Sequence, residues 1–423
     1  MNYDVIVIGA GSSGLMASVS AGEAGANVLL LDKGDKLGRK LGISGGGRCN
    51  VTNAKELDEL IKNIPGNGKY LHSALATFGN RQIIGFFEEL GIRLKEEDNG
   101  RMFPVSDKAK TVVDALVGKV RSLGVHIRVN SPVDRVLYSD DRAVGVRLKS
   151  GESISAGSVI VAVGGKSVPH TGSTGDGYAW AEEAGHTITE LFPTEVPLTS
   201  SASFIQSKEL QGLSLRNVTL TVWNAKGKAV ISHEGDMIFT HFGLSGPIAL
   251  RCSQFVVKEL RKNGGDVKAT IDLKPDRTID ELYSETMAMC KDDSRKAVKN
   301  VLKGYYPERM LPLLFLKAGL REDVTYDNIP KQAWMELARV VKAFPIRING
   351  TLSIEEAFVT GGGVHLKEID PKTLQSKLMG GLYFCGEVLD IHGYTGGYNI
   401  TAAFSTGYNA GKHAAETVRS ILR

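Results

Sequence analysis

The feature that most constrains this 423-residue chain is a glycine motif near its start, Gly9-x-Gly11-x-x-Gly14. The motif follows an apolar run at 4–8 and opens a segment rich in alanine and serine, and a second apolar run ends at Asp32. This order predicts a strand–helix–strand unit. The three glycines then permit a tight turn, close backbone approach to a pyrophosphate, and close helix–strand packing. Because Asp32 can accept hydrogen bonds from a ribose, the pattern favours dinucleotide binding over a glycine-rich packing turn.

Three further segments favour FAD over NAD as that dinucleotide. The glycine-rich stretch 38–50 offers backbone N–H groups and positive charge to phosphate and flavin. A strand expected over 158–163 ends at a glycine pair, and the stretch 386–400 supplies a late carboxylate and a helix N-terminus that can face the flavin ring. The predicted cofactor-binding residues are Gly9, Gly11, Ser12, Ser13, Gly14, Asp32, Lys33, Arg39, Lys40, Ser44, Gly45, Gly46, Gly47, Arg48, Cys49, Asn50, Val133, Gly164, Gly386, Glu387, Asp390, Gly396, Gly397, Tyr398, Asn399 and Ile400.

The pattern of apolar residues and the glycine content of the chain change between about 190 and 345. Short β-like segments come first there, followed by polar, amphipathic helical segments, and the glycine-rich texture returns after residue 345. We therefore predict an α/β fold with a Rossmann-like FAD-binding domain made of both ends of the chain, and an insert that forms the substrate pocket and lid. The expected domains are 1–190 with 346–423, an inserted β-rich domain at 191–275, and an inserted helical domain at 276–345.

Composition excludes several other classes of protein. The chain is 42% hydrophobic, which is too apolar for a disordered protein, and its net charge of +4 permits a polyanionic partner without demanding one. Its four cysteines contain no C-x-x-C pair, which argues against a structural zinc site, a disulfide scaffold and a dithiol redox centre. No metal site is predicted. Without a signal-peptide pattern or an apolar run long enough to span a membrane, the expected location is the cytoplasm.

Several motifs together resemble one flavoprotein family. These are Gly9–Gly14, the stretch 42–53, Phe239–Pro247, Thr360–Val364 and Gly393–Asn399. They are similar to the BaiN/RdsA-like family of NAD(P)/FAD-dependent oxidoreductases, and the similarity runs essentially end to end. The resemblance implies a glutathione-reductase-type FAD fold with an inserted β-barrel-like and helical region. It also implies NAD(P)H-driven reduction of a carbon–carbon double bond, in a steroid-like enone or in a 23S ribosomal RNA uridine that becomes dihydrouridine.

No second strand–glycine–helix unit follows the first, so NAD(P)H is expected to dock transiently at the flavin. The sequence selects neither NADH nor NADPH, and it leaves the oligomeric state open. In the motif-like stretches, His241, His392 and Tyr394 are candidate proton donors, with turn formation or core packing as the alternative. Cys49 is a candidate redox thiol or a small packing residue.

A basic stretch in the insert is a candidate RNA-binding surface. Between residues 294 and 321 the only acid is Glu308, and the cations there are Arg295, Lys296, Lys299, Lys303, Arg309, Lys317 and Arg321. Such a stretch can hold phosphates or can simply be a solvated helix face. Two rival functions also stay open: a flavin oxidase of a small amine that uses oxygen, and a non-catalytic RNA-binding protein that keeps FAD as a structural element.

Overall fold

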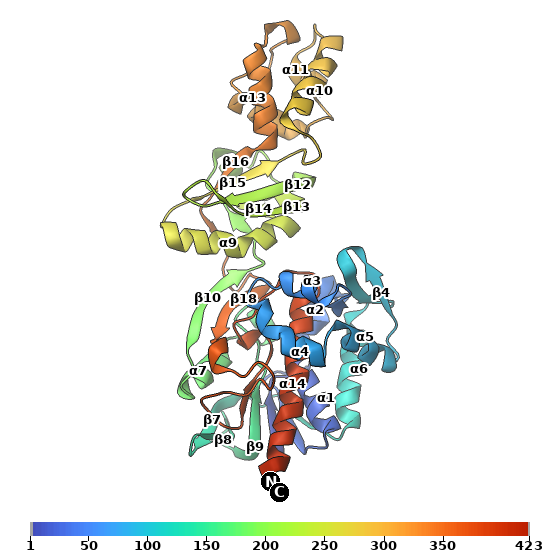
Figure 1. Ribbon diagram of the computed structural model, residues 1–423, viewed down its shortest axis with the longest axis vertical. Helices are drawn as coiled ribbons and strands as arrows, with labels where there is room; N and C mark the ends of the chain where they lie inside the picture. The colour runs from blue at the N-terminus through green and yellow to red at the C-terminus, as the bar shows by residue number, and fades with distance from the viewer. Residues whose placement is uncertain (1–2, 422–423) are drawn as a thin grey trace. The chain divides into compact units, whose positions relative to one another are not determined.

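The computed structural model describes residues 3–421 and divides into two compact units (Figure 1). The first unit combines Met1–Phe192 with Ile354–Arg423, and the second is Pro193–Ser353. The sequence prediction puts these junctions at 190/191 and 345/346. The first unit is therefore built from both ends of the chain, and the second is one continuous insertion.

A largely parallel sheet forms the centre of the first unit. Its parallel strands, in spatial order, are β6 (His126–Arg128), β2 (Val28–Leu31), β1 (Tyr3–Ile8), β9 (Ser153–Val161) and β19 (Leu382–Phe384). On β9, the antiparallel strands β8 (Arg142–Leu148) and β7 (Val133–Ser139) extend the sheet. Ile8 lies opposite both Leu31 and Val161, so the carboxyl ends of β2, β1 and β9 meet at one edge. Ligands of open α/β sheets bind at such an edge, and the predicted α/β class is confirmed.

Two helices from opposite ends of the chain pack together in the first unit. α1 (Ser12–Glu23) follows β1, and α14 (Tyr398–Ile421) is the last helix. Gly407 and Gly411 of α14 lie on one helix face, four residues apart. A Cβ added at Gly407 would lie 2.2 Å from the Ser13 carbonyl oxygen, and one added at Gly411 would lie 2.1 Å from the Ala17 carbonyl oxygen. The two helix backbones therefore touch, because glycine alone leaves room for that approach.

The other elements of the first unit surround this centre. A small antiparallel sheet has the order β3–β5–β4, and β10 pairs with β18. The bounds are α2 Arg39–Gly47, β3 Thr52–Asn53, α3 Leu57–Lys62, α4 His72–Thr77, α5 Asn80–Glu89, β4 Leu94–Glu97, β5 Arg101–Pro104, α6 Ala109–Ser122, α7 Asp176–Glu183, β10 Ile188–Thr194 and β18 Val359–Val364.

The second unit is built on a seven-stranded sheet whose register pairs are antiparallel. The spatial order is β16 (Phe344–Ile348), β15 (Val267–Asp272), β12 (Ser214–Trp223), β13 (Ala229–Phe239), β14 (Gly243–Ser245), β11 (Leu198–Thr199) and β17 (Gly350–Thr351). The two ends of this order, β16 and β17, are separated in sequence by Asn349 alone. The sheet must therefore curl until its two edges approach each other, which gives the barrel-like form.

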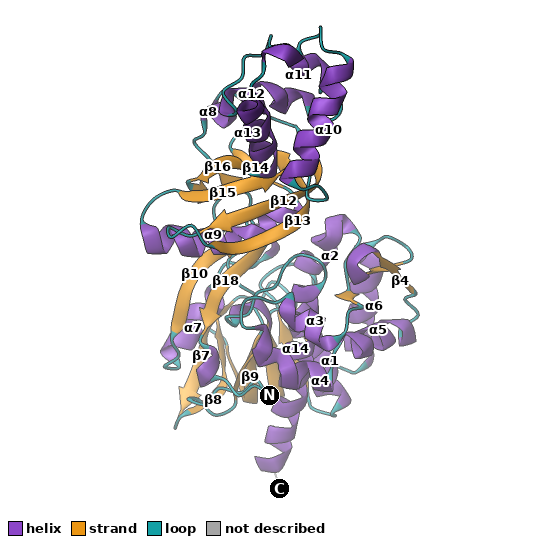
Figure 2. Ribbon diagram, turned by 45° about the horizontal axis from the view of Figure 1, so that its top comes forward, coloured by secondary structure: helices purple, strands orange, loops and turns teal. Residues whose placement is uncertain are grey.

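One hydrophobic core joins the sheet of the second unit to its helices; Figure 2 distinguishes these strands and helices by colour. It includes Leu220 and Ile271 of the sheet, Cys252 of α9, and Leu282 and Trp334 of the helical part. The sequence predicts separate β-rich and helical domains; the structure instead has a single compact unit, because both parts bury the same apolar side chains. The helices are α8 Ser203–Gln206, α9 Pro247–Asn263, α10 Ile279–Asp292, α11 Val298–Val301, α12 Leu311–Lys317 and α13 Lys331–Lys342.

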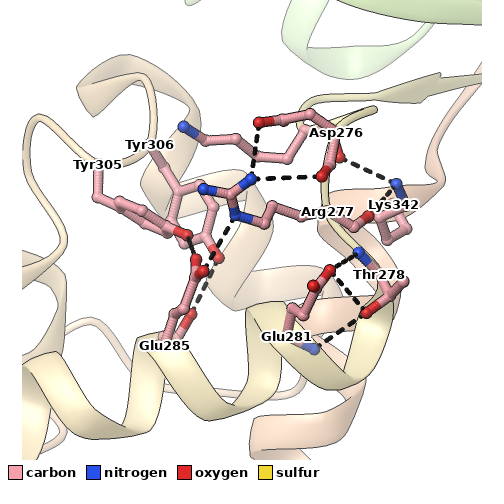
Figure 3. Close-up of polar contacts among 10 residues, drawn as sticks. Asp276, Arg277, Thr278, Glu281, Glu285, Tyr305, Tyr306 and Lys342 are labelled. Carbon is pink, nitrogen blue, oxygen red and sulfur yellow. Dashed lines mark hydrogen bonds and ion pairs between the residues drawn. The ribbon is translucent and has the colours of Figure 1, made fainter.

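A polar network fixes the point where the chain leaves the sheet for these helices (Figure 3). Thr278 and Glu281 form a capping box at the start of α10, with reciprocal hydrogen bonds of 2.8 and 3.2 Å. Arg277 pairs with Glu285 at 3.0 Å. From α13, Lys342 pairs with Asp272 of β15 at 2.7 Å. The network therefore ties α10 and α13 to the end of β15.

Candidate cofactor and active site

The three glycines after β1 have different surroundings. Gly9 has φ +98°, and a Cβ there would lie 2.6 Å from the Ala162 carbonyl oxygen. A Cβ on Gly14 would lie 1.8 Å from the Gly9 carbonyl oxygen, whereas one on Gly11 would meet nothing within 4 Å. Gly11 is also the N-cap of α1, where no side chain caps the helix. Gly9 and Gly14 therefore permit packing, and Gly11 leaves open space where the N–H groups of Ser12 and Ser13 begin the helix.

Asp32 lies beside this open space at the end of β2. Its carboxylate accepts hydrogen bonds from the Ala10 N–H at 2.8 Å and the Gly34 N–H at 2.7 Å. The Ser131 N–H donates to the Asp32 carbonyl oxygen, so the segment just before the buried Val133 also lies here. Two backbone donors thus fix the orientation of the carboxylate at the strand end, next to Gly11.

The predicted flavin loop is a kinked helix. In α2 the backbone leaves helical geometry at Ser44, and Gly45, Gly46 and Gly47 all have positive φ between 57° and 84°. A Cβ on Gly46 or Gly47 would meet nothing within 4 Å. Three successive residues in the left-handed region favour glycine, so Gly46 and Gly47 present bare backbone to open space.

The basic residues near this loop are paired within the protein. Arg48 binds Asp107 at 2.7 Å and also Glu97, and its guanidinium lies 4.2 Å from the Phe103 ring centroid. These hydrogen bonds raise the pKa of Arg48. Arg39 pairs with Asp35, and Lys33 pairs with Asp176 at 2.6 Å. Arg48 therefore anchors the loop to the β4–β5 hairpin instead of offering its full charge to a phosphate.

Glu387 links three distant segments of the first unit. Its carboxylate pairs with Lys40 of α2 at 2.6 Å and accepts a hydrogen bond from the Thr360 N–H at 2.8 Å. The Thr360 hydroxyl in turn accepts from the N–H groups of Lys166 and Ser167, just after Gly164. A Cβ on Gly386 would lie 2.5 Å from the Ser13 hydroxyl oxygen. The late carboxylate and the early glycine motif are therefore neighbours.

The N-terminus of α14 lies against the end of the flavin loop. Gly396 and Gly397 have φ of 129° and 95°, and a Cβ on Gly397 would be 2.6 Å from the Thr52 carbonyl oxygen. The Thr52 and Thr401 hydroxyls are 2.7 Å apart. Tyr398 is buried and starts the helix, and the half-buried Ile400 follows in its first turn. The structure thus brings together the 44–50 loop and the 396–400 turn.

These features fit FAD. An extended dinucleotide needs backbone N–H donors for its phosphates, a carboxylate for its ribose, and a helix N-terminus at its ring. The chain supplies open backbone at Gly11, Gly46 and Gly47, a fixed carboxylate at Asp32, and the start of α14. Side chains added at these glycines would occupy the space that the phosphates and the ring need.

The candidate catalytic residues fall in different surroundings. His392 is 2% exposed and packs edge-on against Phe192, while its backbone pairs with Gly66. Tyr394 is buried, and Asn399 binds the carbonyl oxygen of Tyr394 and both backbone groups of Gly393. The backbone of Asp390 is held by Asn67 and Val364. His241 lies in the second unit, exposed in the turn between β13 and β14.

Cys49 is buried with φ +62° and stands directly after the kinked loop. Burial raises the pKa of its thiol to about 12. Since the thiolate is the reactive form, this environment favours the packing alternative over a redox role.

A family model described as the HI0933-like protein Rossmann domain matches residues 3–413. This chain belongs to the HI0933-like Rossmann family. The 3-dehydro-bile acid delta(4,6)-reductase of Clostridium scindens is 30% identical to it over 97% of this chain and 98% of that protein. The ribosomal RNA dihydrouridine synthase of Escherichia coli is 32% identical over 96% of each. The BaiN/RdsA-like resemblance is therefore confirmed.

Solved structures show the same fold for this HI0933-like chain. A flavocytochrome c3 fumarate reductase in its open conformation matches with a TM-score of 0.52 at 19% identity. The match covers 99% of this chain and 78% of the reductase chain. A 3-ketosteroid-delta4-(5alpha)-dehydrogenase from Rhodococcus jostii has a TM-score of 0.51 at 17% identity, with 98% and 97% coverage. The chain thus has a Rossmann-type FAD-binding domain, and the family supports a flavin-dependent oxidoreductase.

Most cations of the basic stretch 295–321 are paired in the HI0933-like chain. Lys296 pairs with Asp293, Lys299 with Glu322, Lys303 with Glu308 and Arg321 with Asp323. Arg309 donates to the carbonyl oxygens of Glu209 and Gln211. The stretch is therefore largely neutralised in place, which favours the solvated-face alternative for most of its length.

Thr360 has a role that the sequence pattern does not assign to it. In the structure, Thr360 is the link between Glu387 and the turn after Gly164. The sequence signal for this role is the run of three glycines that follows Thr360. A Cβ added at Gly362 or Gly363 would lie within 2.6 Å of a carbonyl oxygen of another segment, so the chain is closely packed here.

Within residues 3–421, no helix is long and apolar enough to cross a membrane, and no cluster of three metal-ligating side chains occurs.

Proposed function

We propose that the protein is an NAD(P)H-dependent reductase of a carbon–carbon double bond conjugated to a carbonyl group, and that its substrate is a uridine in ribosomal RNA. The observation that carries the proposal is the cradle formed by Gly11, Asp32, the 44–50 loop and the start of α14. When bound there, FAD supplies hydride transfer between a nicotinamide and the acceptor. The two relatives named above are a reductase and a dihydrouridine synthase, and both names describe saturation of a double bond.

The protein's own contribution is orientation and a proton. Adding hydrogen across the bond requires a proton at the carbon next to the one that receives hydride. His392 and Tyr394 are the donors we propose within the first unit, because Asn399 and the 63–67 segment fix the backbone that carries them. His241 is the corresponding candidate from the second unit.

Charge favours RNA over a steroid-like enone. The second unit contains 23 Lys and Arg against 18 Asp and Glu, whereas the first contains 28 against 29. The whole positive excess of the chain therefore belongs to the inserted unit. A steroid substrate such as a bile acid carries a single carboxylate, whereas RNA carries a negative charge on every nucleotide and is attracted far more strongly by such a field.

The test is to incubate the FAD-loaded protein with ribosomal RNA and either NADH or NADPH under nitrogen, and to digest the RNA for mass spectrometry. The expected product is a uridine that has gained two hydrogens, formed only with reduced nicotinamide. Asp32→Ala protein, which should bind FAD poorly, is the control. If no uridine is reduced, and oxygen reoxidises the flavin at turnover speed in the presence of a small amine, the oxidase alternative replaces this proposal.

A further inference from the structure

A groove lies on the second unit where the edge of its sheet meets α12. It is an open depression of about 540 Å³, lined by the 201–204 segment, by residues of and just before β15, by β16, and by the end of α12. The core residues Phe204, Leu313 and Ile346 lie buried beneath it, and Leu316 is 73% exposed at its rim. Leu316 therefore offers an exposed apolar side chain to a ligand that lies in the groove.

Three cations line this groove, and two of them face each other. Lys268 of β15 lies directly opposite Arg347 of β16, and Lys317 comes from α12. Like charges directly opposite on an antiparallel pair are destabilising. No carboxylate within residues 3–421 forms an ion pair with any of the three, and Asp266 is the one acidic residue in the lining. An anionic ligand would relieve this repulsion.

An aromatic ring continues the same row. Trp223 of β12 is in register with Lys268, and the Lys268 amine lies 5.9 Å from the indole centroid. Register partners point to the same face of a sheet, so Trp223, Lys268 and Arg347 form a row across three neighbouring strands. Cations interleaved with an aromatic ring are typical of surfaces that bind single-stranded nucleic acid.

We infer that this groove binds a single-stranded segment of RNA, with Lys268, Lys317 and Arg347 on successive phosphates. The inference rests on the proposed function for its choice of RNA. A charged sheet edge can also serve only to prevent edge-to-edge association, and an acidic peptide would satisfy the cations as well. Neither protection of the sheet edge nor binding of an acidic peptide requires the Trp223 ring beside the cations, whereas single-stranded RNA can stack a base on it.

Two matched variants of the full-length, FAD-loaded protein test the inference. The groove variant is Lys268→Ala, Lys317→Ala and Arg347→Ala. The control variant is Lys296→Ala, Lys303→Ala and Arg321→Ala, which removes the same charge from the same unit at cations that are paired with carboxylates. Fluorescence anisotropy with a labelled oligouridylate of roughly 12 nucleotides, over a range of salt concentrations, measures affinity.

We expect the groove variant to bind RNA about tenfold more weakly or worse, and the slope of log affinity against log salt to fall by about 2, since each lost phosphate contact removes about 0.7. The control variant should stay near wild type, and both should keep nicotinamide-driven flavin reduction. Equal RNA affinity in the two variants, no RNA binding by wild type, or equally tight binding of polyglutamate would each overturn the inference.

The same variants separate this inference from the proposed function. If affinity falls in the groove variant but wild type never reduces uridine, the groove binds RNA and the proposed function fails. If wild type reduces uridine but the two variants bind RNA equally well, the proposed function is supported and the groove is not the RNA site.

Discussion

Gly11 and Gly14 differ in what a single methyl group would meet. On Gly14 the methyl would lie 1.8 Å from the Gly9 carbonyl oxygen, whereas on Gly11 it would point into open space. We expect Gly14→Ala to lower the free energy of unfolding of the FAD-free protein by about 1–3 kcal/mol. Gly11→Ala should change that energy by less than about 1 kcal/mol, because the stiffer unfolded chain offsets the poorer N-cap, yet weaken FAD binding strongly because the methyl occupies the phosphate space. Urea unfolding and flavin fluorescence titration separate the two effects. Normal FAD affinity in Gly11→Ala would show that the pyrophosphate lies elsewhere.

All four cysteines are buried. Burial raises the pKa of Cys49, Cys290 and Cys385 to about 12, and it also raises the pKa of Cys252. We expect a chromogenic disulfide reagent at about pH 8 to label no thiol in the native protein and four after unfolding. Above the ordinary thiol pKa the unfolded chain loses protons that the folded protein keeps, so stability should fall as the pH rises from about 9 to about 12. Rapid labelling of a native thiol would contradict this burial.

At the scale of elements, the α1–α14 contact holds the C-terminal part of the cradle against the glycine motif. A Cβ at Gly411 would lie 2.1 Å from the Ala17 carbonyl oxygen. We expect Gly411→Ala to lower the melting temperature and FAD affinity together, because α14 must move away from α1. Gly118→Ala in α6 is the matched control, since its added Cβ meets nothing within 4 Å and the change should stabilise the helix by up to about 1 kcal/mol. Differential scanning calorimetry measures the melting temperature and flavin titration measures the FAD affinity. Equal values for the two variants would contradict the role of the α1–α14 contact.

Local pattern and long-range contact explain which elements the sequence could predict. The βαβ unit was predictable because its first strand, glycine motif, helix and second strand follow one another within residues 3–31. The close contact of Gly9 with Ala162, far along the chain, was not encoded in that local pattern. The pairing of Lys40 with Glu387 joins residues 347 positions apart, and no local pattern encodes it. The basic stretch shows both cases: Asp293 pairs with Lys296 only three residues away and is readable from spacing, whereas Glu322 pairs with Lys299 across 23 positions. Charge neutralisation is decided by folding and not by composition within a window.

On the scale of the whole molecule, the two units have separate cores, and the FAD cradle belongs to the first alone. We therefore expect FAD to stabilise the first unit selectively. At a concentration about one hundredfold above its dissociation constant, FAD adds about 2.7 kcal/mol, which should raise the melting temperature of that unit by roughly 5–10 °C. Trp180 lies in the first unit, and Trp223 and Trp334 lie in the second. In a Trp180→Phe variant, tryptophan fluorescence reports the second unit only, so its transition should stay in place while calorimetry still records the shift. A fluorescence transition that moves with FAD as far as the calorimetric one would mean that the two units unfold together.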